Sequence, residues 1–179
     1  SEREKINSTL FFSKKAQKDF LRLVFKEGLD IACREVTLWR SELIKENLLN
    51  IAEDGSFQLN MLYFDYPAGS RMVNRNFEEL FGGPARKEGS EITQRDMDLA
   101  ASIQLVLEEI ILKLAKSIAK DTGEKNLCLA GGVALNCIAN TALIKSKIFD
   151  NIWVQPAAGD AGGSIGAALS VWYLHYLNK

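Results

Sequence analysis

Apolar residues recur every three or four positions over residues 14–50, which is the spacing of an amphipathic helix with one buried face. Ser13 suits the N-cap position, and Gly28 and Ser41 are residues that can divide the stretch into shorter helices. The pattern predicts a helical segment at residues 1–50. Its apolar positions are Phe20, Leu21, Val24, Phe25, Leu29, Ala32, Cys33, Val36, Trp39, Leu43 and Ile44.

The following region, residues 51–92, is less regular. Asp54-Gly55 predicts a turn, and the alternation over Ser56–Phe64 predicts a strand. Residues 65–92 contain Pro and Gly throughout and predict a long loop, interrupted by a short helix at Phe77–Phe81. A connection of this length is often functional. Its cations either face an anionic ligand or remain in solvent; they are Arg71, Arg75, Arg86 and Lys87.

The clearest helix of the chain is predicted between Thr93 and Gly123. Thr93 and Asp96 have the spacing of a capping box, and Gly123 supplies a left-handed stop. Glu109 and Lys113 form an i,i+4 pair in the favourable order. Polar residues such as Asp98 and Ser102 are expected mostly outside its apolar face. At about 28 residues the helix is about 40 Å long, and we expect it to be a scaffold that lies against a sheet.

The last part of the chain repeats the order strand, glycine-rich loop, helix. The predicted strands are Asn126–Ala130 and Ile152–Val154, and the predicted helices are Leu135–Lys147 and Gly162–Leu177. This alternation is typical of an α/β fold with parallel strand pairs.

The first glycine-rich loop contains Gly131 and Gly132 directly after a strand. Residues without a β-carbon let a flat or anionic group approach the backbone closely. Asn136 and Asn140 are four apart and would share one helix face, where their amides suit an adenine edge or a ribose hydroxyl. They are equally compatible with ordinary polar positions at a helix start.

The second glycine-rich loop precedes the last helix. Gly162 and Gly163 lie where free amides at a helix N-terminus would favour phosphate. Asp160 either caps this helix or holds a metal that bridges to phosphate. Neither loop has the Walker lysine or the GxGxxG spacing. Together the loops predict a binder of nucleotide or phosphate.

Composition narrows the classes of function. The chain has 47% hydrophobic and 25% charged residues and a net charge of −1, which gives no general attraction to nucleic acid or membranes. No apolar run reaches the length of a membrane span and no signal peptide is visible, so we expect a cytoplasmic protein. Cys33, Cys128 and Cys137 lack CxxC spacing and are expected to be buried, reduced thiols. His175 is the sole histidine, which disfavours a metal site or a Cys/His nucleophile formed by this chain alone.

Several motifs in order resemble the nodulation-type O-carbamoyltransferases. They are NLCLAGGVALNCIAN and FDNIWVQPAAGDAGGSIGAAL, preceded by DGSFQLNMLYFDY, FEELFGG and ITQRDMDLAASIQLVLEE, and they cover residues 53–174. The resemblance implies an α/β, actin/Hsp70/sugar-kinase-like (ribonuclease-H-like) fold, similar to that of the tRNA threonylcarbamoyl-adenosine modification enzymes. On this basis residues 51–179 are the C-terminal half of the nucleotide-binding carbamoyl-transfer domain, and residues 1–50 are a helical segment.

The resemblance also implies a reaction. A YrdC-like domain makes carbamoyl-adenylate from carbamoyl phosphate and ATP, and the transfer domain passes the carbamoyl group to a small-molecule acceptor hydroxyl. Asp160 matches the family's aspartate ligand to a divalent metal, which is expected to be iron. The residues that match the family's adenylate and phosphate contacts are Gly131, Gly132, Asn136, Gly159, Gly162 and Gly163.

The chain departs from the family in its missing parts. It has no HxxxH pair for the metal, no first phosphate-binding half and no YrdC-like domain. We therefore expect a fragment that is catalytically incomplete alone and pairs with the missing segments, and a homodimer is compatible with this reading. Two other functions stay open, namely another phosphotransferase of the actin-like superfamily and a non-catalytic nucleotide-binding fragment.

Overall fold

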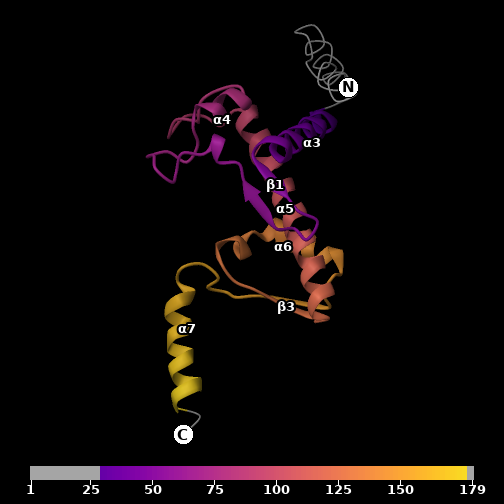
Figure 1. The fold of residues 1–179 in the computed structure, drawn as a ribbon, viewed down its shortest axis with the longest axis vertical. Coiled ribbons are helices and arrows are strands. Elements are labelled where there is room, and N and C mark those ends of the chain that lie inside the picture. Colours follow the sequence, from indigo (N-terminus) through magenta and orange to yellow (C-terminus); the bar gives the residue numbers. More distant parts are fainter. Residues whose placement is uncertain (1–28, 177–179) are drawn as a thin grey trace.

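The computed structural model describes residues 29–176, which form a mixed α/β arrangement (Figure 1). The predicted N-cap Ser13, the break at Gly28 and Leu177 lie outside the described residues. The α-helices are α3 (Leu29–Asn47), α4 (Arg75–Leu80), α5 (Gln94–Thr122), α6 (Cys137–Ser146) and α7 (Gly162–Ser170). The strands are β1 (Leu49–Ile51), β2 (Phe57–Leu59), β3 (Asn126–Leu129) and β4 (Asn151–Val154).

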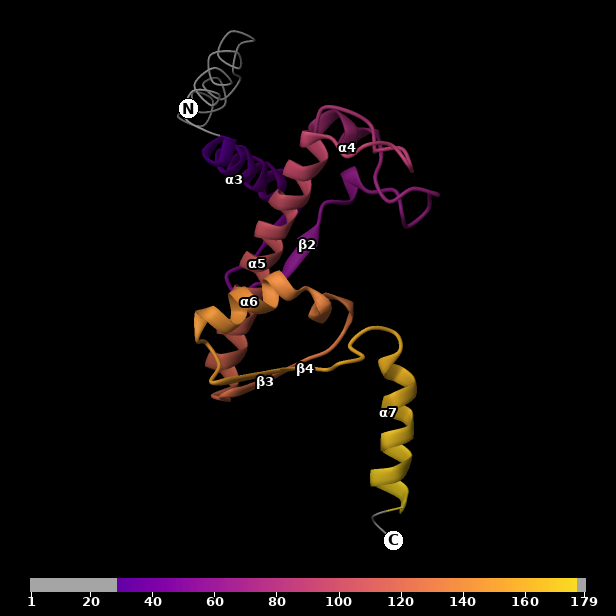
Figure 2. The same ribbon diagram turned by 180° about the vertical axis from the view of Figure 1, so that it is seen from behind.

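Helix α5 runs through the middle of the molecule, and its predicted ends are confirmed (Figures 1 and 2). The Thr93 N–H donates to the Asp96 carboxylate at 2.9 Å, and the Asp96 N–H donates to the Thr93 hydroxyl at 3.3 Å, which is the capping box. Gly123 ends the helix with φ +68°. The Lys113 ammonium and the Glu109 carboxylate are 2.9 Å apart, as the i,i+4 spacing predicts.

Two hydrophobic cores share α5. The N-terminal part of α5 contributes Val106 and Ile110 to a core with Ile44 and Leu48 from the α3 end of the chain. The C-terminal part contributes Ala115 to a second core with α6 and β3–β4. The prediction that α5 lies against a sheet is borne out only in part, because α5 packs mainly on α3 and α6 and strand residues such as Leu127 and Ile152 only border the second core. The second core's other buried members are Leu143 and Phe149.

Asp98 and Ser102 correct the predicted polar face of α5, because both are buried. The Arg40 guanidinium of α3 lies 3.0 Å from the Asp98 carboxylate, and the Ser102 hydroxyl donates to the Asp98 carbonyl at 2.6 Å. Burial of a carboxylate is tolerated when it is paired and hydrogen-bonded. The face that α5 turns to α3 is therefore partly polar.

The region after α3 differs from the prediction in two places. Ser41 does not break α3, because its hydroxyl donates to the Leu38 carbonyl one turn earlier at 2.7 Å. Leu49 and Asn50 were predicted helical but lie in β1, which pairs antiparallel with β2. At the end of α3 the Asn47 carbonyl, which has no partner within the helix, accepts from the Asn60 side chain at 2.8 Å.

Residues 56–64 form a shorter strand than predicted. Strand β2 covers Phe57–Leu59, after which η1 (Met61–Tyr63) makes a 3₁₀ turn. The Asn60 side chain accepts from the Leu62 N–H at 3.2 Å and so caps this turn. The predicted short helix is present as α4, two residues earlier than expected and capped by Asn74.

Strands β3 and β4 are parallel, as predicted, and α6 connects them. Asn126 pairs with Asn151 and Leu129 with Val154. The α/β class is thus confirmed, while the described residues hold two separate two-stranded sheets and the actin-like fold stays a prediction.

Helix α7 extends away from the rest of the molecule in both views (Figures 1 and 2). The predicted helix is confirmed through Tyr176, and its last part, η3 (Val171–Tyr176), winds as a π-helix. Its large apolar side chains are exposed; they are Ile165, Leu169, Val171, Trp172, Tyr173, Leu174 and Tyr176. Between residues 29 and 176, no helix has the combined length and apolar character that crossing a bilayer requires.

Candidate functional site

The two glycine-rich loops lie side by side because they follow parallel strands, whose carboxyl ends meet at one edge. The Gln155 N–H donates to the Leu129 carbonyl at 3.0 Å and extends the ladder by one bond. The Gly131 N–H then donates to the Ala158 carbonyl at 2.8 Å and joins one loop to the other. Ala158 is buried whereas Gly131 is exposed, so this link joins the surface of the first loop to the interior of the second.

The first loop turns at Gly131, whose φ of +99° is one that residues with a β-carbon rarely adopt. From Gly132 to Leu135 the chain makes the 3₁₀ turn η2. The following helix begins at Cys137, two residues later than predicted, because Asn136 is its N-cap and accepts from the Ala139 N–H at 3.0 Å. A β-carbon on Gly132 would meet no atom within 4 Å, so this residue leaves the loop backbone open to approach.

The two asparagines of this loop do not share a helix face, since Asn136 precedes α6 and Asn140 lies within it. The Asn140 side chain donates to the Ala134 carbonyl at 2.7 Å. Asn136 is half-buried and pairs with the amide of Gln104 on α5. Both asparagines therefore have a structural role, and Asn136 keeps one N–H that has no partner among the described residues.

The second loop is ordered by its own backbone. The Ala157 N–H donates to the Gln155 side chain at 2.7 Å. The Gly162 N–H donates to the Gly159 carbonyl at 3.0 Å, and the Gly163 N–H to the Asp160 carbonyl at 3.3 Å. The expectation of free amides at Gly162 and Gly163 is therefore wrong, because the turn that enters α7 uses them.

Gly162 has a steric reason to be glycine. A β-carbon there would overlap the carbonyl oxygen of Ala157, whereas one on Gly163 would meet no atom within 4 Å. Gly159 lies close to the first loop, since a β-carbon built on it would be 3.9 Å from the Leu135 side chain. The second loop thus folds tightly against itself and against the first.

Asp160 does not cap α7. The N-cap is Ala161, and no side chain caps this helix. The Asp160 side chain is exposed, and no hydrogen bond or ion pair joins it to another described residue. Within residues 29–176 no three His, Cys, Asp or Glu side chains gather in a way that could hold a metal. The described residues therefore supply a single carboxylate at this place and do not fit a complete metal site.

Charged groups around the site are few, and the perturbed carboxyl groups lie elsewhere. Hydrogen bonds from Lys113 and then Lys45 hold the pKa of Glu109 below its usual value.

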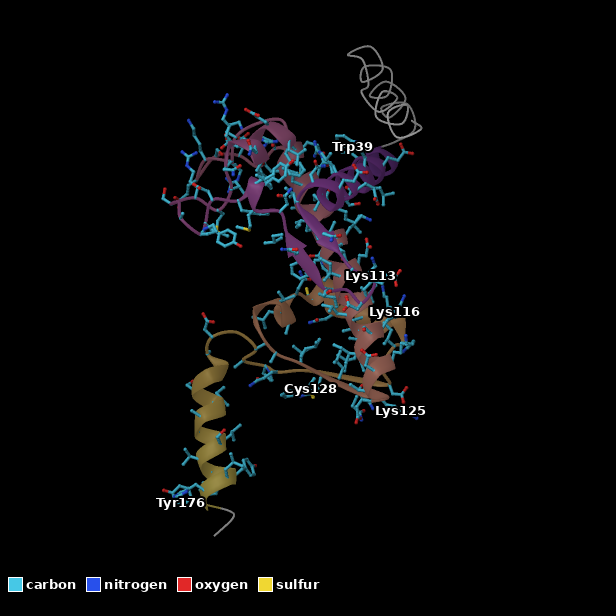
Figure 3. The ribbon with its side chains drawn as sticks, viewed as in Figure 1. Trp39, Lys113, Lys116, Lys125, Cys128 and Tyr176 are labelled. Atoms are coloured by element: carbon cyan, nitrogen blue, oxygen red, sulfur yellow. The ribbon has the colours of Figure 1, made fainter. Side chains whose placement is uncertain are left out.

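His175, on η3, stacks edge-on against Tyr176 at 5.4 Å between ring centroids, and Tyr176 lies at the far end of the α7–η3 helix (Figure 3). The histidine therefore takes no part in the glycine-rich loops.

The outer face of the β3–β4 pair is uncovered. Leu127 and Leu129 face the second core, so the alternation of a strand turns Cys128 to the opposite side, away from α6 (Figure 3). Cys128 and Cys137 are both exposed, which corrects the expectation of buried thiols for these two residues, while the side chain of Cys33 lies outside the described ones. Trp153 on β4 is 55% exposed. Parallel sheets are usually covered on both faces, but no described residue covers this face of β3–β4.

Gln104 is the residue near the site that sequence reasoning missed. It lies on α5, 32 positions before Asn136, and it borders an open and mostly apolar groove between α3, α5 and α6. Its position in a helix gave no signal, because a polar residue on a helix is normally solvated.

Comparison with known proteins adds an independent line of information. Residues 32–169 match a family model described as "Carbamoyltransferase N-terminus". The chain is 55% identical over 138 residues to the uncharacterized protein sll1178 of Synechocystis sp., a match that covers 77% of this chain and 22% of that protein. It is 50% identical over 86 residues to nodulation protein NolO of Bradyrhizobium diazoefficiens, covering 48% of this chain and 16% of NolO.

A third relative is nodulation protein U of the same Bradyrhizobium strain, which is 39% identical over 79 residues, covering 42% of this chain and 14% of that protein. The chain therefore spans less than a quarter of the length of these relatives. The match to the family model includes most of α3, both glycine-rich loops and most of α7.

Proposed function

The chain belongs to the carbamoyltransferase N-terminus family, and from this premise we propose that it is part of a nodulation-type O-carbamoyltransferase. The enzyme moves a carbamoyl group from carbamoyl-adenylate, made from carbamoyl phosphate and ATP, to the hydroxyl of a small-molecule acceptor. The observation that carries the proposal is the link between the two glycine-rich loops, the Gly131 N–H to the Ala158 carbonyl, in a chain with this family's motifs. The link gives the ligand one continuous wall.

In the proposed site the first loop receives the adenylate. Gly131 and Gly132 allow close approach of the nucleotide, and Asn136 offers its remaining N–H. The second loop, with Gly159, Gly162 and Gly163, lies at the phosphate. The amides of Gly162 and Gly163 are used within the turn, so we assign them no hydrogen bond to the ligand. The loop instead offers a close-fitting backbone surface, and the positive end of the α7 dipole attracts the phosphate.

Transfer forms a bond between the acceptor oxygen and the carbamoyl carbon and breaks the bond between that carbon and the phosphate oxygen of the adenylate. AMP is the leaving group, and the hydroxyl proton passes to solvent or to a base outside this chain. The glycine-rich wall orients the adenylate for this attack. No residue described here is assigned as acid or base.

Asp160 is proposed as one ligand of a divalent metal, expected to be iron, that this chain shares with segments outside it. Its exposed carboxylate, free of other partners in the described part of the chain, supports this role. A bound metal would polarise the phosphate or carbonyl oxygens. The remaining ligands have to come from elsewhere, because the described residues provide no others.

The complete enzyme needs further partners, namely the first half of an actin-like fold and a YrdC-like domain. The uncovered face of β3–β4, with Cys128 and Trp153, supports a fold that other segments complete. Neither nucleic acid nor a membrane is a proposed partner, and the dependence on ATP and carbamoyl phosphate suits the cytoplasm.

The test uses the intact Synechocystis relative with its matched segment replaced by residues 32–169 of this chain. We expect conversion of ATP to AMP and pyrophosphate that requires carbamoyl phosphate, and loss of carbamoyl transfer in Asp160→Ala. Phosphorylation of an acceptor by ATP without carbamoyl phosphate would support another phosphotransferase instead. Binding of AMP without any turnover would support a non-catalytic nucleotide-binding protein.

A further inference from the structure

We infer that Gln104 is a positioning residue, which fixes the amide of Asn136 so that Asn136 meets its ligand as a hydrogen-bond donor. The inference rests on the proposed function, because it concerns the same nucleotide site. It adds a residue from α5 to that site and specifies the chemistry of the ligand atom that Asn136 contacts.

The orientation of the two amides follows from a backbone group. The Ala139 N–H donates to Asn136 at 3.0 Å, and an N–H can donate only to the side-chain oxygen, so Oδ1 faces α6. Nδ2 then faces Gln104 and donates to its Oε1 at 2.8 Å. Gln104 Nε2 in turn donates to Asn136 Oδ1 at 3.3 Å and to Glu108 Oε1 at 2.9 Å.

Counting donors and acceptors shows what Asn136 has left. Its Oδ1 already accepts from the Ala139 N–H and from Gln104, which uses both lone pairs. Its Nδ2 has two N–H bonds, of which one goes to Gln104 and the other reaches no partner among the described residues. Since Asn136 is only half-buried, the remaining N–H is available to a ligand.

The free N–H lies at the end of the first glycine-rich loop, because Asn136 directly follows η2. A ligand there must present an acceptor to it, such as a ring nitrogen of a base or an oxygen of a ribose or phosphate. A ligand amino group would meet no acceptor on Asn136. Without Gln104, Oδ1 would regain a free lone pair and the amide would lose one of its two anchors.

The experiment is calorimetric titration of the full 179-residue chain with AMP, at a temperature well below unfolding. We expect Gln104→Ala to weaken AMP binding roughly 10-fold, the effect of about one neutral hydrogen bond. Asn136→Asp keeps a side chain that caps helices well but lacks the donor, so it should bind AMP at least as weakly while α6 stays folded. The double variant should be no weaker than Asn136→Asp alone, because both changes act through one contact.

A merely structural role for Gln104 would lower the melting temperature and leave AMP affinity unchanged, and that result would overturn the inference. Equal AMP binding by Asn136→Asp and the parent chain would overturn it as well. If the parent chain binds no AMP, the proposed site fails as a nucleotide site for this chain. The NMR signals of the Asn136 side-chain amide then decide the positioning: they shift in Gln104→Ala if Gln104 holds this group, and unchanged signals refute it.

Discussion

Two neighbouring glycines offer a sharp test of how the second loop is built. Gly162→Ala places a β-carbon on the carbonyl oxygen of Ala157, whereas Gly163→Ala places one in open space. Both residues lie in the first turn of α7, so the gain in helix preference from alanine is similar in the two variants. Only Gly162→Ala must also displace backbone, which costs about 1–3 kcal/mol for an overpacked position.

The displaced carbonyl is that of Ala157. The next residue, Ala158, has the carbonyl that accepts from the Gly131 N–H. We therefore expect the strain from Gly162→Ala to appear at that hydrogen bond. A cost of about 1–3 kcal/mol corresponds to roughly 5- to 150-fold faster amide exchange at Gly131 through local opening. The assay is hydrogen exchange followed by NMR, with Gly163→Ala as the matched control.

Gly163→Ala should leave exchange at Gly131 unchanged and raise the helicity of α7. If both variants exchange at Gly131 like the parent chain, the loop yields freely at Ala157, and the steric account of Gly162 is wrong. The comparison does not depend on any ligand, so it tests the geometry of the loop separately from its function.

Three further predictions concern the support of the site. Leu143→Ala removes a side chain that is only 1% exposed, and it should lower the free energy of unfolding in urea by about 2–5 kcal/mol. The control is Ile144→Ala at the exposed neighbouring residue, which should lower the free energy of unfolding far less. Equal decreases in the two variants would refute the second core. The hydroxyl of Thr93, and then its N–H, hold the pKa of Asp96 below its usual value, so this cap stabilises α5 above about pH 3.9 and is lost as the pH falls through the lower folded pKa. Circular dichroism during acid titration should show this step in the parent chain and not in Asp96→Ala. Gly55→Ala should lower the melting temperature, because φ is +88° and a β-carbon would overlap the backbone of α5; an unchanged melting temperature would contradict the packing of that turn.

Local signals in the sequence predicted those parts of the fold whose determinants are close together along the chain. The ends of α5 depend on Thr93, Asp96 and Gly123, each of which acts within one helical turn. The parallel pairing of β3 and β4 follows from the short helix between them. Because parallel strands bring their following loops to one edge, the adjacency of the two glycine-rich loops also depends on local order.

The features that the sequence did not predict depend on partners far along the chain. Asp98 is buried because Arg40 reaches it from 58 positions away. Strand β1 replaces the end of a predicted helix because it pairs with β2, and Asn60, 13 positions after Asn47, donates to the last carbonyl of α3. Periodicity describes which residues one element can bury, and it holds no information about which distant polar group will be its partner.

The candidate site shows the same difference between local determinants, which the sequence predicted, and distant partners, which it did not. Gly131 was identified by its place after a strand, and its positive φ gives that choice a physical reason. Asp160 was given two roles, and the structure removes capping because Ala161 occupies the cap position. The pairing of Asn136 with Gln104 joins residues 32 apart, so it was visible only once α5 and α6 were packed together.

Helix α5 also fixes the rotational phase between the two halves of the molecule. It has 29 residues, and it gives Val106 to one core and Ala115 to the other. Each residue of an α-helix advances by about 100° around the axis. One residue inserted between these two positions would therefore turn Ala115 and the second core by about 100° relative to Val106 and the first core, and it would break the pair of Asn136 with Gln104, which spans the insertion point. The number of residues in this helix thus sets the direction in which the site faces, as well as the distance that separates it from the first core.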